Sequence, residues 1–400
     1  MVFIWTTLVS IWRDLPVSAQ IILMLVNGYI GFQLWNYVYS SVVLHRRHKA
    51  FQRAHGCKPG VSYRQYEPLI GLDFVIRMVV AARNHRFLEM FRDVFNEYGS
   101  TWATSSMLKG SMIITNEPEN LRAVQATNFD DWDTASARLA LKPLLGDSVF
   151  MSDGPAWSHG RALLRPIFAK ERMSDLAQLE EHVQAFLRNI PTNGQTFDLQ
   201  ELFFRFTFDT ATGIFFGQSS YTLSKETNEE LVHAFTKAVD DAIGRSRFGR
   251  FYPLIRPKNA HVATEICRKS VNAYVQEALA HVAQQEKQPD LDSDDNDGGQ
   301  KKQRYNFLHE FARETNDEKI LTDNAILMLF AGSDTTGGAI SILWFLLARH
   351  PSAWAKLVAE VDELEGQIPS YEWLRNVKWL RWCANECMPA HQNPSPLLLV

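Results

Sequence analysis

The sequence contains little cysteine, with four residues in 400: Cys57, Cys267, Cys383 and Cys387. So few, irregularly spaced cysteines exclude a disulfide-rich scaffold, and reduced thiols facing a cytosol suit them better. Cys383 and Cys387 lie four residues apart, but no second Cys/His pair accompanies them, so we predict no zinc site.

An excess of positive charge is also absent. The chain has 41 Lys and Arg against 45 Asp and Glu, a net charge of −4. This balance argues against a nucleic-acid-binding protein, which usually carries a basic surplus. With 46% hydrophobic and 22% charged residues, the chain is an ordinary globular sequence, long enough for one to three domains.

A third absence is local, because no charged residue occurs from Val17 to Leu44. This run is long enough to cross a bilayer, and Trp35, Tyr37 and Tyr39 near its far end suit the headgroup zone. The basic cluster at 45–49 follows, and positive charge marks the cytoplasmic side. We therefore predict that residues 1–44 are a membrane anchor and that residues 45–400 form one cytosolic domain.

Two alternatives to the anchor are a cleaved signal peptide and a buried core helix. Val17-Ser18-Ala19 resembles a cleavage site, but no positive region precedes it, and Arg13-Asp14 interrupt the first apolar run. The anchor is the better interpretation.

Helical periodicity dominates the rest of the chain, which predicts a mainly α fold with a minor β component. One strand is expected at Ser111–Thr115, before Asn116-Glu117-Pro118. Helices are expected at 87–98, 119–126, 174–190, 199–216, 225–243 and 260–285. Residues 288–304 are almost free of apolar side chains, so we expect a disordered surface insertion there.

The stretch from Leu321 to Arg349 reads as one long helix that is apolar nearly all round, which is typical of a buried helix. Its centre, 331–338, combines poor helix formers with an acid, and each glycine costs about 1 kcal/mol relative to alanine. A functional interpretation is a locally opened helix, with a groove for a small molecule and the Thr335 hydroxyl beside a buried Asp334 to move protons. Alternatively, the glycines Gly332, Gly337 and Gly338 allow another helix to pack closely. A transmembrane span is a third interpretation, which Asp334 disfavours by about 2.5–3.5 kcal/mol.

Trp157 and Arg161 are four residues apart, so on a helix they share one face. An indole N–H and a guanidinium that point together suit a carboxylate. A cation–π pair on a surface helix is the equal alternative.

Together these motifs resemble the cytochromes P450, the haem-thiolate monooxygenases. Ala331 to Thr336 (AGSDTT) resembles the A-G-x-D-T-T signature of that family, 157–161 its W-x-x-x-R motif, and 348–361 its next segment. The resemblance implies a haem whose propionate Trp157 and Arg161 hold, and which lies against Ala331 and Gly332. It also implies that Asp334 relays protons and that Thr335 stabilises iron-bound oxygen.

The texts GDSVF at 146–150 and DLQELFFR at 198–205 resemble the fungal branch that hydroxylates alkanes and fatty acids. The resemblance extends from about Gly56 to Glu386. It implies lipophilic substrates, an NADPH-cytochrome reductase as electron donor, and an endoplasmic reticulum membrane protein with a single span and a cytosolic body.

The carboxyl terminus departs from the family. Glu386 matches the Glu of E-x-x-R, but Pro389 stands where the Arg is expected, so this helix is predicted to end early. The tail from Pro389 onward resembles nothing in the family, and the F-x-x-G-x-R-x-C-x-G loop with the axial Cys does not follow. We interpret the chain as a truncated or mis-spliced product. The alternatives are a catalytically dead, membrane-anchored binding protein and a helical membrane protein whose second span is the central helix.

Overall fold

The computed structural model divides the chain into two units, Met1–Val61 and Ser62–Val400, each described by itself. The described residues are 16–56, 60–66, 71–84, 86–106, 110–134, 138–168, 176–224, 229–246, 248–287, 306–391 and 398–399. The predicted insertion at 288–304 therefore lies outside them.

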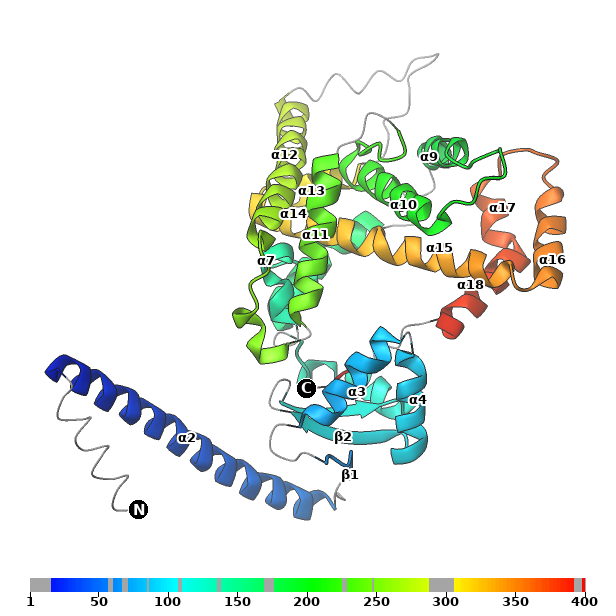
Figure 1. The fold of residues 1–400 in the computed structure, drawn as a ribbon. Coiled ribbons are helices and arrows are strands. Elements are labelled where there is room, and N and C mark those ends of the chain that lie inside the picture. The colour runs from blue at the N-terminus through cyan, green and yellow to red at the C-terminus, as the bar shows by residue number, and fades with distance from the viewer. Residues whose placement is uncertain are drawn as a thin grey trace. The chain divides into compact units, whose positions relative to one another are not determined.

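The first unit contains one long helix, α2 (Val17–His55) (Figure 1). It ends at Gly56, whose left-handed backbone (φ 64°) lets its N–H bond to the carbonyl of Gln52. The predicted helix is thus confirmed, and it continues past Leu44 through the basic cluster. Its crossing of a membrane stays a prediction, as does the domain boundary at residue 44.

The sheet contains four strands in the order β1-β2-β3-β4. The central pair is antiparallel, with Thr101 opposite Thr115, and Leu398 pairs with Ile114 on the other side of β3. The strands are β1 (Val61–Ser62), β2 (Thr101–Ser106), β3 (Gly110–Thr115) and β4 (Leu398–Leu399). The predicted strand is confirmed as part of β3.

Two helices, α3 (Leu72–Arg83) and α4 (Phe87–Tyr98), share a small aromatic core with this sheet. The rings of Phe74 and Trp102 meet edge to face with centroids 5.2 Å apart, a favoured aromatic geometry. The helix predicted at 87–98 is confirmed as α4.

The remaining elements are mostly helical and are built around a larger core (Figure 1). Within it, α10, α12 and α14 pack together, and every side chain from Leu321 to Leu329 is buried. The helices are α5 (Pro118–Arg122), α7 (Lys142–Leu145), α8 (Gly154–Leu164), α9 (Leu176–Arg188), α10 (Leu199–Phe216), α11 (Glu229–Ser246), α12 (Ala260–Lys287), α13 (Phe307–Glu314), α14 (Glu318–Gly332), α15 (Asp334–Leu347), α16 (Pro351–Asp362), α17 (Tyr371–Asn376) and α18 (Lys378–His391). Short helical turns are η1 (Ala123–Thr127), η2 (Phe129–Asp131), η3 (Leu139–Leu141), η4 (Val149–Met151), η5 (Arg165–Phe168) and η7 (Gly249–Leu254).

Among the described residues, Glu318–Leu347 has the length and composition to cross a membrane. Its first half is buried by protein, however, against α10 and α12. In the second half, α15, the buried residues are Gly337 and Leu347. The core helix of a globular protein can pass the same test of length and composition, and the buried first half is consistent with one.

The central helix is interrupted at one residue: α14 ends at Gly332 and α15 begins at Asp334, while the bonds from the Ser333 N–H to the Leu329 carbonyl and from the Gly337 N–H to the Ser333 carbonyl continue across the break. The prediction about the last helix was wrong, because this helix does not end before Pro389 but runs on to His391. A proline so close to a carboxyl end removes only one backbone donor, and little helix remains beyond it to disrupt.

Candidate functional site

The junction of α14 and α15 presents two different faces. Ala331, Asp334 and Thr335 are exposed, whereas Ser333 and Gly337 are buried. Positions three and four residues apart share a helix face, so the three exposed residues form one strip. The junction therefore packs with one side and offers an alanine, an acid and a hydroxyl on the other.

The buried side of the junction is shaped by close approach to α10. A Cβ on Gly332 would come within 2.9 Å of the Phe215 ring, and one on Gly337 within 2.7 Å of the Phe204 ring. The close-packing interpretation is thus confirmed for these two glycines. It fails for Gly338, where an added Cβ would meet nothing within 4 Å.

Two hydroxyls turn back onto the helix at the break. Ser333 Oγ donates to the Leu329 carbonyl at 2.7 Å, and Thr335 Oγ1 donates to the Ala331 carbonyl at 2.6 Å. Such bonds to the carbonyl four residues earlier often bend a helix. The local opening predicted from the poor helix formers is present at Ser333, and it fixes the Thr335 hydroxyl on the exposed side.

The prediction that Asp334 is buried was wrong, since its surface is exposed. The reason is geometric: the close contact with α10 occupies the glycine side, so the acid turns outward. Partial desolvation by the surrounding protein, with the Asp240 carboxylate nearby, still raises the pKa of Asp334. A carboxyl with a raised pKa holds its proton more readily and is suited to proton transfer.

Trp157 and Arg161 share helix α8, as predicted. The Arg161 guanidinium carbon lies 5.4 Å from the Trp157 ring centroid, and the Phe129 ring centroid lies 4.9 Å away on the same indole. Trp157 is half-buried and Arg161 is exposed. The cation–π contact is therefore present, and it leaves the guanidinium N–H groups free to face an anion.

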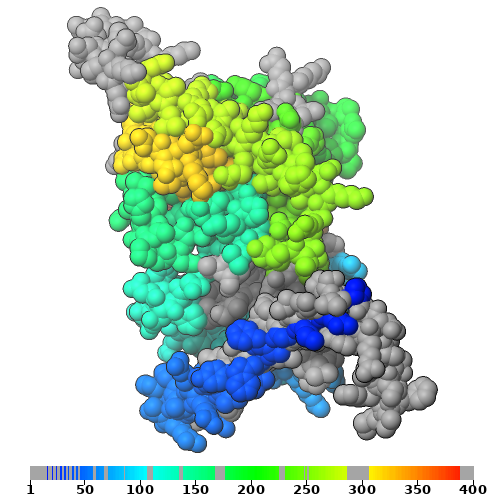
Figure 2. Space-filling model, turned by 90° about the vertical axis from the view of Figure 1, so that its left-hand side faces the viewer, coloured from blue at the N-terminus to red at the C-terminus, as the bar shows by residue number. Residues whose placement is uncertain are grey.

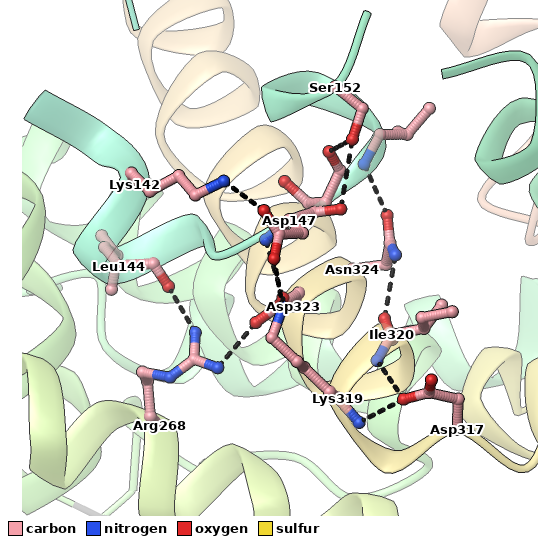
Figure 3. A network of polar contacts seen from close by, with 12 residues as sticks. Lys142, Leu144, Asp147, Ser152, Arg268, Asp317, Lys319, Ile320, Asp323 and Asn324 are labelled. Atoms are coloured by element: carbon pink, nitrogen blue, oxygen red, sulfur yellow. Dashed lines mark hydrogen bonds and ion pairs between the residues drawn. The ribbon is translucent and has the colours of Figure 1, made fainter. Parts of the chain in front are cut away.

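A polar network ties α14 to the loop that leads into α8 (Figure 3). The fully buried Asp323 accepts from the backbone N–H of Asp147 at 2.7 Å, from Arg268 at 2.6 Å and from Lys319 at 3.1 Å. Arg268 also donates to the Leu144 carbonyl at 3.0 Å. A buried carboxylate with three donors is well compensated.

The same loop is bound at two further points. Lys142 and Lys319 both donate to the Asp147 carboxylate, and these bonds lower the pKa of Asp147 to about 2. Asn324 accepts from the Val149 N–H at 3.0 Å. The loop is therefore fixed on α14 shortly before α8 begins.

Gly146 is the residue that this arrangement requires. Its φ is +56°, and a Cβ there would lie 2.0 Å from Asp323 Oδ1. Sequence reasoning noticed GDSVF only as a family likeness and missed Asp323 and Asn324. Two adjacent polar residues inside the apolar run LTDNAILMLF were the available signal, because buried polar groups need partners.

Among the contacts of the described residues, no hydrogen bond or ring contact joins the α8 pair, Trp157 and Arg161, to the strip formed by Ala331 at the end of α14 with Asp334 and Thr335 at the start of α15, called here the α15 strip. What connects them is the α14 network, which holds the segment before α8. The site therefore consists of two separate groups of residues, and α14 holds the elements that carry both of them.

These residues fit some parts of a haem and not others. The α8 pair offers hydrogen-bond donors that suit a haem propionate. The α15 strip offers an alanine surface, a proton donor and a hydroxyl that suit a face of the haem ring. The axial position needs a thiolate. The described cysteines lie on α12 (Cys267) and α18 (Cys383 and Cys387), and none of them is on α8 or at the α14–α15 junction. Burial raises the pKa of Cys267 to about 12 and also raises the pKa values of Cys383 and Cys387.

Comparisons with known proteins identify the family. The family model "Cytochrome P450" matches residues 67–398. The match extends beyond Glu386, so the prediction that the resemblance ends there was wrong. Strand β4, which lies in this tail, pairs with β3 of the sheet.

Curated relatives are fungal. The chain is 37% identical to cytochrome P450 monooxygenase himC of Aspergillus japonicus, over 87% of this chain and 63% of that protein. It is 34% identical to cytochrome P450 52A3-B of Candida maltosa, over 80% of this chain and 63% of that protein. The chain thus spans less than two thirds of the length of these relatives.

Among solved structures, the haem domain of cytochrome P450DA is similar in fold, with a TM-score of 0.65 at 18% identity over 83% of this chain and 70% of that one. The mainly helical architecture with a small sheet is therefore the P450 fold. On the family match and the fungal relatives, the chain belongs to the cytochrome P450 family.

Proposed function

We propose that this protein functions in the haem-dependent hydroxylation of long-chain alkanes or fatty acids, with O2 and with electrons from an NADPH-cytochrome reductase. Its likeness to the fungal 52A relatives supports the substrate class. The observation that carries the proposal is the α15 strip, where the hydroxyl of Thr335 and the raised-pKa carboxyl of Asp334 face outward together.

In this proposal each group has a defined task. Trp157 and Arg161 hold a haem propionate with an indole N–H and a guanidinium. Ala331 and the partly exposed Gly332 would offer a surface without large side chains to the haem, although one side of Gly332 is already occupied by Phe215 of α10. Asp334 would hold and deliver protons, and the Thr335 hydroxyl beside it would donate to the bound oxygen once it turns from the Ala331 carbonyl, to which it donates in this structure. Haem, when bound, supplies the activation of O2.

The proposal includes a membrane location. An uncharged run inside α2, followed by the basic cluster, supports a single span in the endoplasmic reticulum membrane with the body in the cytosol. Lipid-soluble substrates concentrate in a bilayer, so such an anchor keeps the protein near them.

A chimera tests the activity, since the relatives are longer than this chain. The chain is continued with the carboxyl-terminal part of the Aspergillus japonicus relative, and the product is supplied with haem, reductase and NADPH. Expected are a thiolate-type carbon monoxide spectrum and hydroxylated dodecane or dodecanoate by mass spectrometry. A chimera that shows the spectrum but oxidises neither probe contradicts the proposed substrate class.

A further inference from the structure

Asn324 is a polar residue inside the buried run of α14, and only 2% of its surface is exposed. Figure 2 shows the teal segment with α7 and α8 beside the yellow α13 and α14, on which it packs. Burying an amide costs free energy unless its hydrogen bonds are made. The partners of the Asn324 amide therefore indicate what this residue does.

Both ends of the Asn324 amide are bound to the backbone (Figure 3). Its Nδ2 group donates to the Ile320 carbonyl at 2.8 Å, one turn earlier on α14, and its Oδ1 accepts from the Val149 N–H at 3.0 Å. Val149 begins the turn η4, and the first N–H groups of a helical turn have no partner inside it. Asn324 supplies this partner from 175 residues away in the chain.

The side chain of Val149 carries this restraint to α8. A Cβ added to Gly160 would lie 3.5 Å from Val149 Cβ, an ordinary contact distance, so α8 lies against Val149 at this point. Gly160 stands three residues after Trp157 and directly before Arg161. The position of Val149 therefore determines how α8 is seated, and with it where the indole and the guanidinium point.

We propose that Asn324 is a positioning residue for the α8 pair. It holds Val149, and Val149 seats α8 so that Trp157 and Arg161 face the same anion. That this anion is a haem propionate rests on the proposed function. The positioning itself does not, because it is a property of the chain without haem.

The haem-free measurement is fluorine NMR of the full chain in detergent, labelled with fluorotryptophan, with the Trp157 resonance assigned by Trp157→Phe. In Asn324→Leu the Val149 N–H loses its acceptor, so the Trp157 resonance should shift or broaden. Thr212→Val is the matched control, because it also removes the side-chain acceptor of a backbone N–H, that of Ser220, at a fully buried position on α10. A Trp157 resonance that Asn324→Leu leaves unchanged, or that Thr212→Val moves equally, overturns the proposal.

Two further variants separate positioning from a general loss of stability. Val149→Ala removes the contact with Gly160 but keeps the bond to Asn324, so its effect on the Trp157 resonance should not add to that of Asn324→Leu. Asn324→Asp at about pH 6 should restore the native resonance, because a buried carboxyl keeps its proton and then offers the same acceptor and donor as the amide. Additive effects without this restoration would show that the lost bond is not the cause.

Haemin binding then tests the connection to the proposed function. The Kd of haemin, measured by quenching of tryptophan fluorescence, should rise about fivefold in Asn324→Leu, the value of about one hydrogen bond. When Trp157→Phe and Arg161→Ala are both present, Asn324→Leu should have less than about a twofold effect. A fivefold effect that persists in that background overturns the proposal. A haemin Kd that the Trp157 and Arg161 substitutions leave unchanged contradicts the proposed haem role alone, since the Trp157 resonance reports the positioning without haem.

Discussion

The carboxylate of Asp323 accepts a hydrogen bond of 2.7 Å from the backbone N–H of Asp147, 176 residues earlier in the chain. Through this bond α14 fixes the segment that leads into α8. The same helix continues, after the break at Ser333, into the exposed strip with Asp334 and Thr335. Both groups of candidate site residues therefore depend on α14, although they do not touch each other.

The first prediction concerns the space beside Asp323. Gly146→Ala should lower the free energy of unfolding by about 2–4 kcal/mol, because it adds a steric clash to a left-handed backbone that already costs about 1–2 kcal/mol with a side chain. The Cβ would lie 2.0 Å from the Asp323 carboxylate. Urea denaturation followed by circular dichroism measures the difference.

Gly194→Ala is the matched control, because φ there is +77° but an added Cβ meets nothing within 4 Å. It should show only the backbone cost. Equal losses in the two variants would mean that Asp323 does not constrain position 146.

The second prediction is a dependence of stability on pH. Burial, the stacked His281 ring and Arg313 lower the pKa of His309 to about 4. The His309 imidazole therefore binds a proton more tightly in the unfolded chain than in the folded chain. Its contribution to the free energy of unfolding is present above pH 6.5 and is lost as pH falls towards 4. In His309→Gln, the free energy of unfolding should fall by about 1 kcal/mol less between pH 7 and pH 4 than it does in the native chain. This value allows for solvent screening of a half-exposed group.

Chemical denaturation at several pH values between 7 and 4 is the measurement. His233→Gln, an exposed histidine on α11, serves as control and should keep the slope of the native chain. A slope that His309→Gln leaves unchanged would place the acid sensitivity elsewhere.

The third prediction concerns the strip on α15 and uses the chimera described above. Asp334→Ala should slow turnover by about 10²-fold, because a proton donor is lost. Thr335→Ala should lower the product formed per NADPH consumed and raise hydrogen peroxide. Thr336→Ala, the next exposed threonine, should do neither. Unchanged turnover and coupling in the first two variants would remove both residues from the mechanism.

The fourth prediction is the topology of the amino terminus. Deletion of residues 1–44 should release the protein from membranes during carbonate extraction, because the uncharged run is removed. A glycosylation site added after Val400 should stay unmodified if the body lies in the cytosol. Its modification would show that the orientation is reversed.

The sequence predicted those elements whose signals are local. The helix at Leu199–Phe216 has the predicted bounds because Asp198 caps its start, with bonds to the N–H groups of Gln200 and Glu201, and Gly217 ends it in a left-handed conformation. The Trp157–Arg161 pair was likewise visible as a spacing on one helix.

Long-range contacts were not visible in the same way. Nothing near Asp323 in the sequence indicates that its partners are Asp147 and Arg268, since those contacts exist only after three segments meet. The outward turn of Asp334 was missed for the same reason, because it follows from the contact between Gly332 and Phe215 on α10.

The last prediction concerns the 400-residue chain mixed with haemin. We expect a reduced, carbon-monoxide-bound spectrum without the thiolate-type Soret band. The axial ligand of this family is a thiolate. Among the described cysteines, Cys267 on α12 and Cys383 and Cys387 on α18 all lie outside α8 and the α14–α15 junction, which carry the candidate haem-binding residues. Trp157 and Arg161 alone can hold a propionate but not the iron. Arg161→Ala should therefore weaken haemin binding, measured by quenching of tryptophan fluorescence, without changing the type of spectrum. A thiolate band in the native chain that disappears in Cys387→Ser would show that this cysteine binds the iron.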